Sequence, residues 1–269
     1  MKHILSYFCI LNLVSITLAC NLYKTGTSIV KPGEQSQYWD DNFVKIKGGD
    51  FIFGCSDSST DCFDDEKPKL LVHVKDFELM STEVTYETWY KIYPAESKIN
   101  DGNPEKCLNC PVSGVSWEKV IVFIKSLNGE LTYLNDTLEY RLPTEVEWEY
   151  AAKGGRLTQG KKFAGSNDIE EVSWYAGNTS KIQQVKSKKP NELGIYDMSG
   201  NVMEWCSNSF WSYSKGVSTM TNGNNASRCV LRGGGCGSNA TYCRVTCRVA
   251  DSPASSHFDY GFRLVRAKK

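Results

Sequence analysis

The second half of this chain lacks any long periodic helix, and this feature limits its fold more than any other. From Gly155 onward the sequence is rich in Gly, Asn and Ser, with scattered aromatic residues. The first half, by contrast, contains two helical patterns and several short alternating runs. This distribution predicts an irregular α+β domain with little regular secondary structure.

The strand signals are concentrated near the start of the domain. Apolar and polar residues alternate over residues 43–53 around Gly48 and Gly49, which predicts a β-hairpin. The loop at residues 56–68 is polar and acidic. Further strands are expected at residues 70–77, 230–231 and 262–265.

Two helices have recognisable starts and ends. Ser116 opens the first, whose apolar residues share one face and which Gly129 is expected to stop. Thr144 and Glu147 form a capping box at the start of the second, and Gly154 follows its end.

The N-terminus is typical of an export signal. A basic start precedes the apolar run at residues 4–19, which is too short for a comfortable membrane span and ends at Ala19-Cys20. Cys20 indicates the lipidated cysteine of a bacterial lipoprotein, and the alternative is a plain secretory signal followed by a free cysteine. We therefore expect an exported protein, anchored by lipid in the outer membrane or at the cell surface. The predicted organisation is a signal at 1–19, a polar tether at 20–38 and one domain at 39–269.

Nine cysteines remain in the mature chain outside Cys9 and Cys20. Cys55 and Cys62 are close in sequence, as are Cys107 and Cys110, and export favours two local disulfides. A zinc site made by these four thiolates is the alternative, because the second pair has ligand spacing. Lys and Arg balance Asp and Glu, so charge gives no indication of a nucleic-acid partner.

Four motifs in order identify a family. They are RLPTEVEWEYAA at 141–152, PNELGIYDMSGNVMEW at 190–205, LRGGG at 231–235 and GFRLV at 261–265. Together they resemble the formylglycine-generating-enzyme (sulfatase-modifying-factor) family, over about residues 43–266. The resemblance implies a C-type-lectin-like fold.

The same resemblance argues against catalysis. Oxidase members of the family use two redox cysteines and a serine near the end of the domain. Cys243 falls on the first cysteine position, but the second falls on Arg248, one residue past Cys247, and the serine position is Gly235. A slip of one residue on a strand turns a side chain to the opposite face. We expect a non-catalytic domain; the alternative is an oxidase that converts a sulfatase cysteine to formylglycine.

In this family the turn at 197–204 wraps a structural calcium ion. Carboxylates at Asp197 and Glu204, with the carbonyls of Gly200 and Val202, would be the ligands here, and these oxygen donors suit a hard cation. The alternative is that Asp197 caps the turn and Glu204 pairs with an arginine.

The C-terminal segment, residues 233–263, is unusual in composition because it contains no Lys, Glu, Gln, Met or Trp. This bias resembles the variable proteins of diversity-generating retroelements, most closely the spirochaete lipoprotein with this fold. The alternative is an ordinary Ser/Gly/Asn-rich surface loop. The resemblance implies diversified ligand-binding positions at Cys236, Gly237, Ser238, Asn239, Tyr242, Cys247, Asp251, Ser252, Ser256, His257, Phe258, Asp259 and Tyr260.

A position can vary freely only where packing does not constrain it. We therefore expect these side chains to be exposed on one patch, while Arg232, Cys243, Arg244 and Arg263 stay buried or hydrogen-bonded. The expected partner is a protein or glycan ligand, with the membrane reached only through the lipid anchor. A structural envelope protein without a specific ligand is a further alternative.

Overall fold

A computed structural model of the chain describes residues 42–55, 61–93, 107–133, 138–216 and 223–268. Among these residues no helix is long and apolar enough to cross a membrane. The predicted signal, Cys20 and the tether lie outside the described residues. The elements are β1 (Phe43–Ile46), β2 (Gly49–Phe53), η1 (Asp64–Glu66), β3 (Leu70–Val74), β4 (Phe77–Met80), α3 (Tyr86–Ile92), α4 (Trp117–Tyr133), β5 (Leu138–Arg141), α5 (Glu145–Ala152), η3 (Gly155–Leu157), α6 (Ile169–Val172), β6 (Met203–Ser209), η4 (Tyr213–Lys215), η6 (Gly223–Asn225), β7 (Cys229–Arg232), η7 (Ala240–Cys243), β8 (Arg248–Asp251), β9 (Tyr260–Gly261) and β10 (Val265–Lys268).

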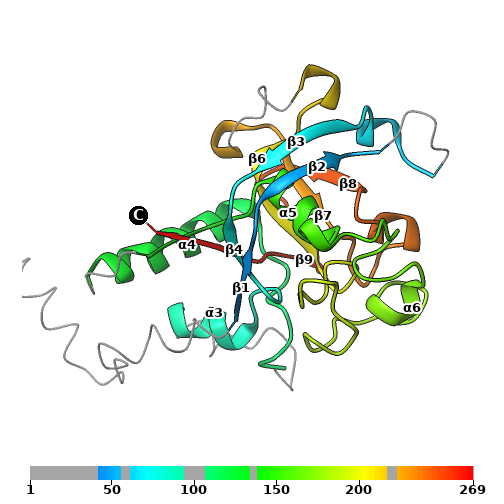
Figure 1. Ribbon diagram of the computed structural model, residues 1–269. Helices are drawn as coiled ribbons and strands as arrows, with labels where there is room; N and C mark the ends of the chain where they lie inside the picture. Colours follow the sequence, from blue (N-terminus) through cyan, green and yellow to red (C-terminus); the bar gives the residue numbers. More distant parts are fainter. Residues whose placement is uncertain (1–41, 56–60, 94–106, 134–137, 217–222, 269) are drawn as a thin grey trace, which may run out of the picture. The chain divides into compact units, whose positions relative to one another are not determined.

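The strands form three small sheets, which run in the orders β1-β4-β10-β5, β2-β3 and β8-β7-β6-β9 (Figure 1). β10 pairs antiparallel with both β4 and β5, so a strand from the C-terminal end occupies an inner position of the first sheet. Between α5 and β6, the described chain has only the short helices η3 and α6. The expected α+β fold with little regular structure is confirmed.

The predicted hairpin at residues 43–53 is wrong in its pairing. β1 and β2 are both strands, but β1 pairs with β4 and β2 pairs with β3. Gly48 is required for another reason: a Cβ there would lie 2.1 Å from the carbonyl oxygen of Val74. The glycine lets the chain that leaves β3 pass close to the chain that enters β2.

The helix starts are better predicted than the ends. Thr144 caps α5 as expected: its side chain accepts from the Glu147 amide, and the Glu147 carboxylate accepts from the Thr144 amide. α4 begins at Trp117 but continues past Gly129 to Tyr133. Of the two late strands, β7 contains residues 230–231, whereas 262–264 lie between β9 and β10.

Aromatic side chains supply much of the buried core. Trp148 and Trp205 are fully buried, and the ring of Trp89 stacks on that of Phe123 at 4.7 Å between centroids. Burial of a large apolar side chain contributes about 1.5–3 kcal/mol, so a few such residues can support a domain with little regular structure.

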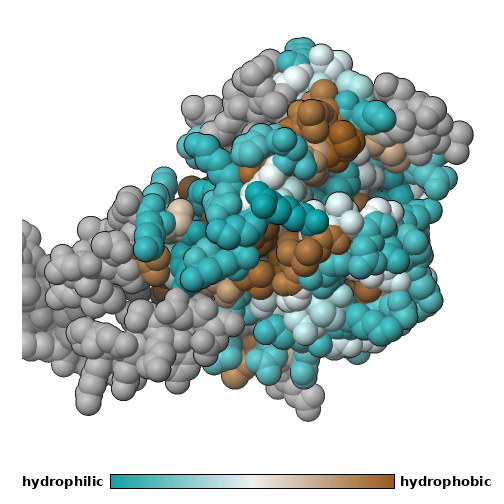
Figure 2. Space-filling model, in the orientation of Figure 1, coloured by the Kyte–Doolittle hydropathy of each residue, from teal (hydrophilic) through white to brown (hydrophobic). Residues whose placement is uncertain are grey.

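Some large apolar side chains remain outside this core. Ile52 and Leu71 face each other across β2 and β3 and are 48% and 73% exposed. Figure 2 shows a hydrophobic area over this part of the molecule, within a mostly hydrophilic surface.

Candidate functional site

The C-terminal segment folds as a series of short elements joined by turns. It leaves β7, makes a glycine-rich turn into η7, continues through β8 and turns again before β9. Seven of its thirteen predicted binding positions are exposed: Gly237, Asn239, Tyr242, Ser252, Ser256, His257 and Phe258. We call these seven residues the exposed face.

The glycine-rich turn lies close to both aromatic parts of this face. A Cβ at Gly234 would lie 3.0 Å from the Tyr242 backbone, and one at Gly237 would lie 2.8 Å from the Phe258 ring. Between them, a Cβ at Gly235 would come within 2.3 Å of a carboxylate oxygen of Asp259. Larger residues would push the turn away, so these glycines allow the close approach.

Behind His257 and Phe258 lies a polar network. His257 Nδ1 is 3.1 Å from Asp259 Oδ1, and the Tyr260 hydroxyl donates to Asp251 Oδ2 at 3.0 Å. The His257 ring lies 5.2 Å from Phe258 and 5.5 Å from Tyr260, between centroids. The exposed rings therefore rest on hydrogen-bonded residues below them.

The expectation that all thirteen positions are exposed is wrong. Cys236, Ser238, Cys247, Asp259 and Tyr260 are buried, and Asp251 is half-buried. Several have a clear role inside the domain. The Ser238 hydroxyl accepts from the Gly235 amide, the Cys247 carbonyl accepts from Arg232, and the Tyr260 ring packs edge-on against Trp205.

The predicted scaffold is confirmed, because Arg232, Cys243, Arg244 and Arg263 are all buried. Each of the three arginines, like Arg248, pairs with a buried carboxylate contributed by an earlier part of the chain. The pairs are Arg232–Glu149, Arg244–Glu66, Arg248–Glu145 and Arg263–Glu204. These buried ion pairs attach the segment to the rest of the domain, so its exposed side chains do not have to pack against the core.

Cys243, at the family's first redox position, and Cys247, one residue before the second, have separate surroundings. Cys243 packs with Phe163 and Val172, whereas Cys247 lies within the electrostatic reach of Glu66 and Arg244. Both are free and buried, and burial raises the pKa of each thiol to about 12. Thiolate is the form that binds metals and attacks disulfides, so neither sulfur is prepared for such chemistry at neutral pH.

The expected calcium ligands are engaged by protein groups. The Asp197 carboxylate accepts from the Lys186 amide at 2.9 Å. Both oxygens of Glu204 accept from Arg263 at 2.7 Å, and one also accepts from Trp148. Gly200 and Val202 are buried in the same turn. The Glu204–Arg263 pair agrees with one half of the alternative, whereas Asp197 binds Lys186, which precedes the turn. Calcium binding stays a prediction.

Sequence reasoning missed one carboxylate near this turn. Glu83 is fully buried, and both of its carboxylate oxygens lack a hydrogen-bond partner among the residues described. Burial raises its pKa well above the usual range, and the charge of Asp197 adds to the effect. Burial also raises the pKa of Asp197 to about 6. Glu83, Asp197 and Glu204 therefore all lie within the electrostatic reach of Arg263.

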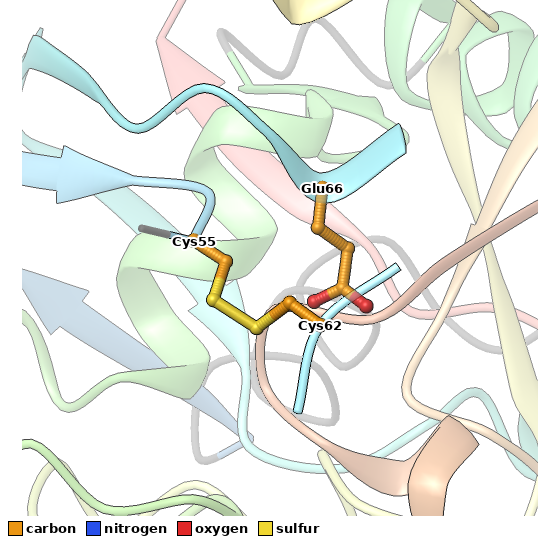
Figure 3. Close-up of side chains that lie close together, drawn as sticks. All are labelled: Cys55, Cys62 and Glu66. Carbon is orange, nitrogen blue, oxygen red and sulfur yellow. A yellow bond between two sulfur atoms is a disulfide. The ribbon is translucent and has the colours of Figure 1, made fainter. Parts of the chain in front are cut away.

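A second feature missed by sequence reasoning is the region around Glu66. The structure contains the disulfides Cys55–Cys62 and Cys107–Cys110, as expected in preference to a zinc site. Cys55, Cys62 and Glu66 are also the one group of three metal-capable side chains found within the described ranges (Figure 3). The sulfurs are joined to each other, however, and Arg244 binds both Glu66 oxygens.

Known proteins of similar sequence and structure share this fold. The chain is 29% identical over 274 residues to the chaperone protein LppX of Paenibacillus barcinonensis, covering 85% of this chain and 90% of that protein. It is 32% identical over 197 residues to the formylglycine-generating enzyme of Streptomyces coelicolor, covering 65% of this chain but only 57% of the enzyme. The structure of Treponema denticola variable protein 1 is similar, with a TM-score of 0.68 and 27% identity over 83% of this chain and 94% of that one.

The relatives include enzymes as well as a variable protein, so membership alone does not decide activity. The sulfatase-modifying factor enzyme 1-like domain model matches residues 29–268, nearly the whole chain. On this match, and on a fold shared with these relatives, the chain belongs to the sulfatase-modifying factor enzyme 1-like family.

Proposed function

We propose that this protein is an exported, lipid-anchored ligand-binding protein, displayed at the cell surface, which recognises its ligand through the exposed face. One observation carries the proposal. Seven positions of one segment are exposed, and the same segment is held by buried arginine–carboxylate pairs. A rigid support of this kind reduces the entropy that is lost when a ligand binds.

The residue types of the exposed face suit recognition. Tyr242 and Phe258 are 38% and 54% exposed and offer large contact areas. Ser252, Ser256 and Asn239 add hydroxyl and amide groups around them. Tyr, Ser, Gly and Asn are also common in antibody binding loops, because they combine rigid contact area with adaptable hydrogen bonds.

The similarity to Treponema denticola variable protein 1 supports a variable role for the segment. The absence of Lys, Glu, Gln, Met and Trp between residues 233 and 263 supports the same idea. In this proposal, the variable positions are the exposed ones, and buried members such as Cys247 vary little. An adenine-rich near-copy of the segment beside a reverse transcriptase gene is expected, and its absence would speak against a retroelement origin.

Catalysis is not part of this proposal. An oxidase would need two cooperating sulfurs, whereas Cys243 and Cys247 lie in different environments and burial favours their protonated forms. Gly235 also offers no hydroxyl at the family's serine position.

Selection of peptide ligands tests the binding face directly. A random peptide library on phage is panned against the mature protein, and the selected peptides are measured against two triple-alanine variants. One variant removes Tyr242, His257 and Phe258, and the control removes Ile52, Leu71 and Leu157, which are also exposed. We expect binding to fall at least about tenfold, or ~1.4 kcal/mol, only in the first variant. Equal binding to both variants would overturn the proposal.

A further inference from the structure

The acidic loop before β3 is attached to the C-terminal segment. Arg244 donates to both oxygens of Glu66, at 2.8 and 2.6 Å, and also to Cys62 Sγ at 3.4 Å. Figure 3 shows the Glu66 carboxylate beside the Cys55–Cys62 disulfide. Residues 61–66 therefore lie against the segment that carries the exposed face, although they are distant in sequence.

This attachment places Phe63, which lies outside the proposed variable segment, next to Tyr242, one of its proposed variable positions. The rings of Phe63 and Tyr242 are 5.7 Å apart between centroids and are inclined at 40°. Phe63 is 41% exposed and Tyr242 38% exposed, so together they form one partly open aromatic surface. The Arg244 guanidinium lies 5.5 Å from the Phe63 ring centroid, within the range of a cation–π contact.

Phe63 is held on both sides. The Cys55–Cys62 disulfide immediately precedes it, and Arg248 donates to the carbonyl of Asp65, two residues later, at 3.3 Å. A ring fixed in this way loses little freedom when it contacts a ligand.

The charge around Phe63 is strongly acidic. Between Cys55 and Pro68 the sequence contains five carboxylates and one lysine. Arg244 neutralises Glu66 internally, while Asp64 and Asp65 are exposed. Lys67 and Lys162 approach Asp64 and Asp61 at 3.7 and 3.5 Å, so they compensate only part of this charge.

We propose that Phe63, with Asp64 and Asp65, forms a constant wall of the recognition surface and receives an arginine or lysine side chain of a protein ligand. This inference rests on the proposed function and gives the ligand a chemical class: a protein segment with exposed basic residues. The aromatic faces would attract the cation, which contributes about 0.5–1 kcal/mol at an exposed site, and the carboxylates would add a salt-sensitive attraction. The variable positions would then select among basic ligands.

A hexa-arginine peptide is the probe for this wall. It is titrated into the mature protein at low salt, and binding is followed by calorimetry and by the ring-proton resonances of Phe63 and Tyr242. We expect saturable binding that shifts both rings and weakens with added salt. Phe63→Ala should weaken binding roughly fivefold, corresponding to ~1 kcal/mol, while Phe63→Tyr should retain it. Ile52→Ala, at an exposed position on β2, is the matched control and should leave binding unchanged.

Two outcomes would overturn the inference: no saturable binding of hexa-arginine, or binding that Phe63→Ala leaves unchanged. Neither outcome affects the proposed function if peptides selected from the library still depend on Tyr242, His257 and Phe258. If the selected peptides no longer depend on these three residues while hexa-arginine still binds at Phe63, the proposed function is wrong. Phe63 would then belong to a separate cation-binding surface.

Discussion

Arg244 and Glu66 are 178 residues apart in the sequence, yet they meet through two charge-assisted hydrogen bonds of 2.8 and 2.6 Å. Glu66 is fully buried and Arg244 nearly so. Removal of either partner leaves a buried charge without compensation, which typically costs about 3–5 kcal/mol.

We therefore expect Glu66→Gln and Arg244→Met each to lower the free energy of unfolding by about 3–5 kcal/mol in urea titrations. Asp76→Asn is the control, because the Lys47–Asp76 pair is of similar length but well exposed. It should cost less than about 1 kcal/mol. Similar losses in all three variants would mean that the Arg244–Glu66 pair does not secure the C-terminal segment.

The buried acids near Arg263 predict a specific pH dependence. The pKa of Asp197 is raised by burial from 3.8 to about 6, so the native state binds this proton more tightly than the unfolded state. Its contribution to stability is complete below about pH 4 and is lost as the pH rises through 6, by at most ~1.4 kcal/mol per pH unit. The pKa of Glu83 is also raised by burial, so Glu83 too makes stability fall as the pH rises.

Asp197→Asn should therefore flatten the fall in stability between pH 4 and 6, relative to the natural protein. Asn tolerates the left-handed backbone at this position (φ 59°) and can still accept from the Lys186 amide. Urea titrations over this pH range measure the difference, with Glu87→Gln on α3 as an exposed control. Parallel curves for Asp197→Asn and the natural protein would show that Asp197 keeps its ordinary pKa.

We propose that Ca²⁺ binds at the turn of residues 197–204, where Asp197 and Glu204 would exchange their contacts with Lys186 and Arg263 for the ion. Added Ca²⁺ should raise the melting temperature of the metal-stripped protein at pH 7, and the gain should shrink toward pH 5 as protons compete. Asp197→Asn should reduce the gain. An unchanged melting temperature with and without Ca²⁺ rejects this site.

The buried thiols should be inert. With the pKa of Cys243 and Cys247 at about 12, we expect iodoacetamide at pH 8 to label neither residue until the protein is unfolded. Incubation with a sulfatase-type cysteine peptide, copper and oxygen should produce no aldehyde. Formation of formylglycine that depends on Cys243 and Cys247 would establish the oxidase alternative instead.

Export through Cys20 is tested in the cell of origin or in a bacterial host. A palmitate analogue should label the natural protein, whereas Cys20→Ser should abolish labelling and release soluble protein. Equal labelling of both would exclude lipidation at this position.

Local chemistry was predictable from the sequence wherever neighbouring residues decide it. The capping box at Thr144 and both short-range disulfides belong to this class. The buried arginines do not, because their partner carboxylates lie 59 to 178 residues away in the sequence. The pairing of strands was not predictable. β1 and β2 follow each other across a turn, yet β1 pairs with β4 and β2 pairs with β3.

The site shows the same division. Composition identified the C-terminal segment as a whole, but it could not separate exposed Phe258 from buried Tyr260, two residues later. The contact of Tyr260 with Trp205 decides that difference, and it depends on a distant part of the chain. Phe63 was missed because its relation to Tyr242 exists only after Arg244 and Glu66 have paired.

The position of β10 has a consequence for the order of assembly. Residues 265–268 lie between β4 and β5 and join these two strands, although β10 is more than half of the domain away from either of them in sequence. Before these residues leave the ribosome, β4 and β5 each have an edge without its pairing strand, even if the earlier elements are already formed. The first sheet can close only after residues 265–268 have left the ribosome, so the interval before closure is when this chain is most open to chaperones, to proteases and to pairing with another copy.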